Sequence, residues 1–102
     1  MKREIRISKR ALNKLAILLD FLENEWSLKV KNNFIQKLDK SLKHIQKLPE
    51  SFPESQKING LRKCVVTRQT TIFYKFTDAK IDVVMIFDNR KNPKSFIKEI
   101  EE

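Results

Sequence analysis

The sequence predicts one α+β domain with the order β-α-α-β-β-β-α: a helical hairpin packed on a small, mainly antiparallel sheet, with a short C-terminal helix. Three observations predict it. Two stretches in the first half repeat apolar residues at helical spacing, and three short apolar runs follow in the second half. The 102 residues, 40% apolar and 34% charged, are enough for one hydrophobic core. We therefore treat 1–102 as a single domain.

The first half predicts a strand and two helices. Residues 3–7 alternate polar and apolar side chains, which is typical of a half-buried strand. Residues 9–26 predict a helix capped by Ser8, with an apolar stripe of Leu12, Leu15, Leu19, Leu22 and Trp26. Residues 27–47 predict a second helix capped by Ser27, with a stripe of Phe34, Ile35, Leu38, Leu42 and Ile45. Its opposite side carries Lys37, Lys40, Lys43 and Lys47.

The second half predicts a loop, three strands and a helix. Residues 49–60 hold two of the three prolines and the single glycine, which indicates a loop. Strands are expected over 61–67, 70–76 and 81–87, joined by short polar breaks as in an antiparallel meander. The last strand is apolar on both faces, so we expect it to be central and covered on both sides. A short helix is expected over 94–101, and the partner of the first strand is left open.

The composition excludes several classes of function. One cysteine, Cys64, cannot form an internal disulfide, which favours a reducing cytoplasm. Cys64 and the single histidine, His44, cannot make a zinc site by themselves, and one glycine excludes a phosphate-binding glycine loop. No apolar run approaches the length of a membrane span. We expect no metal, no cofactor, no small-molecule substrate and no membrane partner.

The net charge of +9 suits a large anionic or acidic partner. A basic cluster is expected on and beside the sheet, consisting of Arg62, Lys63, Arg68, Lys75, Arg90 and Lys91. One interpretation is a phosphate-binding concavity in which Phe73 or Tyr74 stacks on a base. The other is a solvated sheet rim whose charges discourage edge pairing, with both aromatic rings in the core. The sequence leaves both open.

A second candidate surface lies on the first helix. Ile17 and Phe21 are spaced i and i+4, roughly opposite the main stripe, among polar residues. If both are exposed, they form an apolar site for a partner's helix or chain. The alternative is that they pack the side of the hairpin against the second helix.

The C-terminal half carries a family resemblance. Gly60-Leu61-Arg62-Lys63, the strand 72–76 and the stretch 81–87 followed by Asp88-Asn89-Arg90-Lys91-Asn92-Pro93 resemble the RelE/ParE superfamily of type II toxin–antitoxin toxins. The resemblance covers nearly the whole chain. It implies a bacterial cytoplasmic toxin neutralised by a cognate antitoxin protein, and we assign the Ile17 and Phe21 site to antitoxin binding. RelE-like members cut messenger RNA on the ribosome, whereas ParE-like members inhibit DNA gyrase without being nucleases.

The resemblance also allows the two activity classes to be compared. The RelE-like site uses two basic residues, two further arginines and a tyrosine, at positions that here hold Val66, Arg68, Thr71, Arg90 and Phe96. Only Arg68 and Arg90 match, and a lost proton-transfer group costs about 10²–10⁴-fold in rate. We therefore expect a ParE-like gyrase inhibitor. The alternatives are a ribosome-dependent mRNA endonuclease that uses Arg68 and Arg90, or a degenerate relative that binds antitoxin without toxicity.

Overall fold

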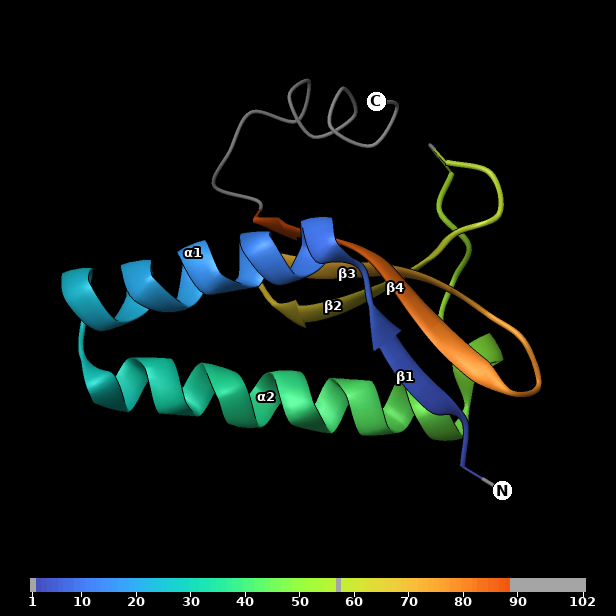
Figure 1. Cartoon of the computed structure of the whole chain (residues 1–102), viewed down its shortest axis with the longest axis horizontal. Coiled ribbons are helices and arrows are strands. Elements are labelled where there is room, and N and C mark those ends of the chain that lie inside the picture. Colours follow the sequence, from blue (N-terminus) through green and yellow to red (C-terminus); the bar gives the residue numbers. More distant parts are fainter. Residues whose placement is uncertain (1, 57, 89–102) are drawn as a thin grey trace.

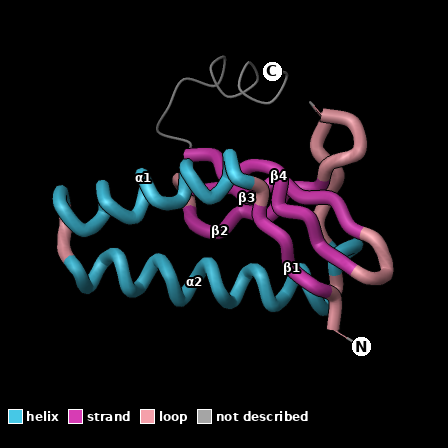
Figure 2. Tube along the Cα trace, in the orientation of Figure 1, coloured by secondary structure: helices cyan, strands magenta, loops and turns pink. Residues whose placement is uncertain are grey.

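The computed structural model describes residues 2–56 and 58–88. Two long helices form a hairpin along one face of a four-stranded sheet (Figures 1 and 2). The elements are β1 (Glu4–Ile7), α1 (Lys9–Glu25), α2 (Leu28–Lys47), a 3₁₀ turn η1 (Pro49–Ser51), β2 (Arg62–Thr67), β3 (Thr70–Phe76) and β4 (Lys80–Asp88). The predicted α+β order is confirmed as far as residue 88. The helix expected over 94–101 lies outside the described residues.

The sheet is mixed, with the strand order β1-β4-β3-β2. β4 is a central strand, as its apolar sequence predicted. It pairs antiparallel with β3, and β3 pairs antiparallel with β2. β1 runs parallel to β4, with Ile5 opposite Ile81, which answers the pairing that the sequence left open. The two edges of the sheet are therefore β1 and β2.

Both predicted helix caps are confirmed. The Ser8 side chain accepts a hydrogen bond from the Ala11 backbone N–H at 3.0 Å, and Ser27 accepts one from the Val30 N–H at 3.1 Å. On α2 the predicted stripe supplies three buried residues, Phe34, Leu38 and Ile45. The exception on that stripe is Ile35, which is 39% exposed.

The predicted stripe on α1 is wrong at its two ends. Leu12 is 49% exposed and Trp26 is 68% exposed, whereas Ala11 is fully buried. The middle of the stripe is confirmed, because Leu15, Leu19 and Leu22 pack against the core. Ala11 and Leu18, which flank the stripe, are buried beside them. Ala11 follows Ser8, which is hydrogen-bonded to β4, so its small side chain suits the close approach of α1 to this strand. Trp26 follows the last helical residue, and its backbone angles (φ −120°, ψ −90°) carry it out of the helical phase.

Hydrophobic clusters lie on both faces of β4, as predicted. Ile81, Val83 and Ile86 contact the cluster beneath the helices, and Met85 and Phe87 join the cluster on the opposite face. The side chains change faces at an irregularity in the β3–β4 register, where Phe73 pairs with Met85 but Tyr74 pairs with Val83, which leaves Val84 as an extra residue. Ser8 binds this bulge: its N–H donates to the Val83 carbonyl at 2.9 Å and its hydroxyl to the Val84 carbonyl at 2.8 Å.

The loop before β2 is fastened to the sheet. The fully buried Tyr74 donates its hydroxyl hydrogen bond to the Pro49 carbonyl at 2.5 Å. The Phe52 ring lies edge-on to Tyr74 and to His44, at centroid distances of 6.3 and 4.9 Å. Residues 49–56 therefore form an ordered cover beside β2.

Candidate interaction surface

Arg62 has a structural role in the predicted basic cluster. Its guanidinium donates to the Phe52 carbonyl at 2.6 Å and to the Glu50 carbonyl at 3.3 Å. It also lies 3.6 Å from the Glu54 carboxylate and 5.7 Å from the centre of the Phe76 ring. Arg62 therefore fastens the loop to β2, and its donors point into the protein.

The other basic residues of the cluster do not converge with Arg62. Lys63 follows Arg62 in β2, so its exposed side chain lies on the opposite face of the sheet, away from the helices. Lys75 is exposed on that same face of β3 and pairs across the sheet with Asp82, beside a shallow hollow of about 290 Å³. Arg90 and Lys91 lie outside the described residues. The described members thus divide between the two faces.

The positions compared with the nuclease site are only partly available to a substrate. Arg68 is exposed in the turn between β2 and β3, and Val66 is partly buried against the main core. Thr71, which the resemblance compares with an arginine, is 6% exposed. The aromatic residues Phe73 and Tyr74 are 5% and 0% exposed, so the interpretation that one of them stacks on a base is wrong. Both belong to the core.

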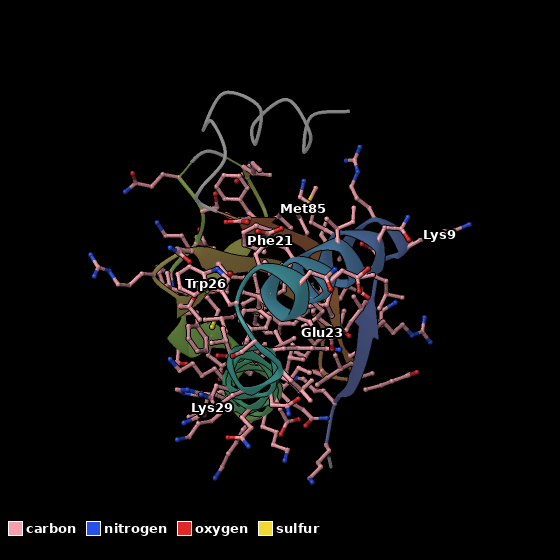
Figure 3. The ribbon with its side chains drawn as sticks, turned by 90° about the vertical axis from the view of Figure 1, so that its left-hand side faces the viewer. Lys9, Phe21, Glu23, Trp26, Lys29 and Met85 are labelled. Carbon is pink, nitrogen blue, oxygen red and sulfur yellow. The ribbon has the colours of Figure 1, made fainter. Side chains whose placement is uncertain are left out.

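Ile17 and Phe21 lie on the flank of α1 that faces away from α2. Ile17 is 64% exposed and Phe21 38% exposed. The Glu23 carboxylate binds the Lys31 ammonium at 2.9 Å, which places α2 against the other flank of α1. Figure 3 shows Phe21 on the upper side of α1 and Glu23 on the lower side. Packing of Ile17 and Phe21 against the second helix is therefore wrong.

A basic groove lies between α2 and the edge strand β2, and the sequence alone did not predict it. It holds about 570 Å³ and is lined by Lys37, Lys40, Ser41, His44 and Val66. A neighbouring hollow of about 270 Å³ shares Lys37 and continues toward the β2–β3 turn. The lysines were assigned to the solvated side of α2. Their i, i+3 spacing was visible in the sequence, but their position beside a sheet edge was not.

The described part of the chain offers little conventional chemistry. Burial raises the pKa of the Cys64 thiol, which disfavours the reactive thiolate, while a hydrogen bond from Ser41 opposes the shift. The described side chains include no group of three or more metal-binding residues. Among the same residues, neither helix is long and apolar enough to cross a membrane.

Solved chains from two toxin–antitoxin systems share this fold. The chain is similar to a protein of the chromosomal ParDE toxin–antitoxin system of P. aeruginosa, with a TM-score of 0.72, 12% identity, and coverage of 84% of this chain and 95% of that chain. It is also similar to a chain of the E. coli DinJ–YafQ toxin–antitoxin complex, with a TM-score of 0.61, 14% identity, and coverage of 88% and 96%. A search of curated proteins found no match.

The sequence itself identifies the family. Residues 5–93 match the model described as the ParE toxin of the type II toxin–antitoxin system parDE. This chain belongs to the ParE toxin family, within the superfamily that its motifs resemble.

Proposed function

We propose that this chain is the toxin of a type II toxin–antitoxin module and acts in the cytoplasm as an inhibitor of DNA gyrase. The observation that carries the proposal is the family match over residues 5–93. The burial of Thr71 at a position where the nuclease class has an arginine supports a non-enzymatic mode of action. Inhibition then requires only contacts with the enzyme and no proton transfer.

A supercoiling assay tests this proposal. Purified gyrase and relaxed plasmid are incubated with increasing amounts of the chain, with and without its antitoxin. We expect supercoiling to fall with the toxin and to recover with the antitoxin. Arg68→Ala is the matched variant and should still inhibit gyrase, because a protein-contact inhibitor that does not cut RNA has no catalytic need for this exposed arginine. Full supercoiling activity at saturating toxin contradicts the proposal.

Cleavage of mRNA on the ribosome is the second candidate, because Arg68 is exposed at the β2–β3 turn. It requires Arg68 and Arg90 to act without the tyrosine of the nuclease class. A translating extract with an end-labelled message tests it. Codon-phased cuts that disappear in Arg68→Ala favour cleavage, and an intact message at a toxic dose excludes it. Normal growth on expression without antitoxin would indicate a non-toxic relative.

We further propose that the antitoxin covers Ile17 and Phe21. Their exposed flank on α1 offers apolar area to a partner's helix. Phe21→Glu is expected to weaken antitoxin binding by at least about 10-fold, because burying an unpaired carboxylate is costly. Ala16→Glu adds the same charge at an exposed position of the same helix and serves as the control. Equal affinities for both variants remove this flank from the interface.

A further inference from the structure

The free edge of β2 is already half covered by the chain itself. The Lys63 N–H donates to the Pro53 carbonyl at 3.0 Å, and the Ser55 N–H donates to the Leu61 carbonyl at 2.7 Å. These bonds flank an antiparallel bridge between Glu54 and Arg62. Residues 53–55 thus act as a short fifth strand, and their central carboxylate lies 3.6 Å from Arg62.

The rest of this edge is open. In a strand, the N–H and C=O of one residue point to the same side, and residues two apart point alike. Because the Lys63 N–H faces residues 53–55, the N–H of Val65 faces the same edge beyond them, just before the irregularity in the β2–β3 register between Val65 and Thr67. Within the described ranges no other backbone segment pairs there. The Val65 side chain is 61% exposed, so the edge is also accessible.

The open edge borders the basic groove. Lys37 and Lys40 of α2 stand on one side of this groove, and Val66 of β2 stands on the other. No carboxylate lines this groove or the adjoining hollow in the part of the chain that the structure describes. A strand added beside Val65 directs alternate side chains toward the groove. Acidic side chains at those positions reach the two lysines, while apolar ones contact Val66.

We propose that an extended acidic segment of the antitoxin adds antiparallel to β2 beside Val65, in line with residues 53–55, and places its carboxylates in the Lys37–Lys40 groove. This inference rests on the antitoxin partner of the proposed function. Backbone pairing supplies affinity and the lysines select the charge of the segment. A second copy of this chain is a poor occupant, because each copy carries a net charge of +9 and the same basic groove.

Peptides test the chemistry of the site directly. A capped peptide of alternating Val and Glu is titrated into the ¹⁵N-labelled full chain, and a Val–Lys peptide of equal length is the control. We expect the acidic peptide to slow amide exchange at Val65 and to shift the resonances of Lys37 and Lys40. Val65 is the reporter because its amide faces the open edge. Equal binding of both peptides, or an unchanged Val65 amide, overturns the proposal.

Paired variants separate backbone pairing from charge. Val65→Pro removes the edge N–H without touching the β2–β3 ladder, and Val65→Thr keeps that N–H. Lys37→Glu reverses a groove charge, whereas Lys43→Glu reverses one that pairs with Asp39 at 3.0 Å outside the groove. We expect Val65→Pro and Lys37→Glu to weaken peptide binding at least about 10-fold, and their controls less than about 3-fold. A circular dichroism melt confirms that Val65→Pro is folded.

The cognate antitoxin distinguishes this inference from the proposed function. If the antitoxin binds and slows exchange at Val65, both stand. If it binds with full affinity to Val65→Pro and Lys37→Glu, the edge site is wrong and the toxin–antitoxin assignment stands. If it does not bind the unmodified chain, the proposed function fails, while the peptide titration still reports on the chemistry of the edge.

Discussion

The two edges of the sheet are built differently, and the difference shows where a partner chain can be added. β1 has four residues, and its outward-facing Glu4 and Arg6 form an ion pair at 3.5 Å, which discourages pairing with another strand. β2 has six residues and exposes Val65 on its open part. The β1 edge is thus protected by its charged side chains and its short length. The β2 edge is covered by the chain only at its start.

The attachments of the two edges also differ. β1 is fixed at its start by the Arg3 guanidinium, which donates to the Thr77 carbonyl at 2.9 Å and to the Gln46 carbonyl at 3.2 Å. At its end Ser8 binds the β4 bulge. β2 is fixed at its start by Arg62, whose guanidinium, like that of Arg3, lies over the Phe76 ring. The Phe76 ring therefore contacts both arginines that fix the edge strands.

The largest expected effect is at the start of β2. Arg62→Ala removes two hydrogen bonds to carbonyls and the contact with Phe76, so we expect it to lower the free energy of unfolding by about 2–3 kcal/mol. Urea unfolding measures the change. Lys63→Ala is the neighbouring control and should stay within about 0.5 kcal/mol. Equal losses for the two variants would show that Arg62 does not hold the loop.

The next effect is at the end of β1. Ser8→Ala removes an N-cap and the hydroxyl bond to the Val84 carbonyl, with an expected loss of about 1–2 kcal/mol. Ser27→Ala removes a cap alone and is the matched control, with an expected loss of about 1 kcal/mol. Thermal or urea unfolding of both variants gives the difference. A smaller loss for Ser8→Ala than for Ser27→Ala would argue against a link between helix and bulge.

Local patterns predicted the elements well and the orientation of α1 less well. The strand over 70–76 was predicted at its exact bounds, because polar residues interrupt the apolar run on both sides. The stripe on α1 was wrong at its start because hydropathy ranks Leu12 above Ala11. Close packing against β4 favours the smaller side chain. This preference depends on the shape of the strand that the helix packs against, so the helix sequence alone does not reveal it.

The candidate site was harder to predict, because it depends on chain segments that meet only after folding. From the sequence, Arg62 is expected to be a surface charge. In the fold, carbonyls of the preceding loop accept hydrogen bonds from its guanidinium. From the sequence, Lys37 and Lys40 are expected on the solvated face of α2. In the fold, they line a groove beside β2, which is an edge strand of the sheet. Ile17 and Phe21 were singled out from their spacing opposite the core stripe, and both are exposed. Their role in antitoxin binding stays a prediction.

A smaller effect is expected at the buried hydroxyl behind the β2 loop. Tyr74→Phe removes the bond to the Pro49 carbonyl and should cost about 1 kcal/mol at neutral pH. Burial raises the pKa of Tyr74 to about 12, from an ordinary value of 10.0. Above pH 10 the unfolded state loses its proton before the folded state does. Stability should therefore fall between about pH 10 and 12, and this slope should weaken in Tyr74→Phe.

Absorbance at alkaline pH measures this titration without interference, because the chain has a single tyrosine. The phenolate band should appear near pH 12 in the folded chain and near pH 10 in denaturant. A folded-state transition near pH 10 would show that solvent reaches the hydroxyl and that the loop does not cover it.

The smallest effect is expected on the open part of β2, and it sharpens the contrast with β1. Val65→Thr should change the free energy of unfolding by less than about 0.5 kcal/mol, because the side chain is mostly exposed and its backbone pairing is unchanged. Ile5→Thr on β1 should cost at least about 1 kcal/mol, since Ile5 packs against the core beneath the helices. Urea unfolding of the two variants compares the free energy lost at the β1 edge, which packs on the core, with that lost at the open part of the β2 edge. A loss at Val65 as large as that at Ile5 would mean that the fold already depends on this edge, and an added strand would then have less free surface to occupy.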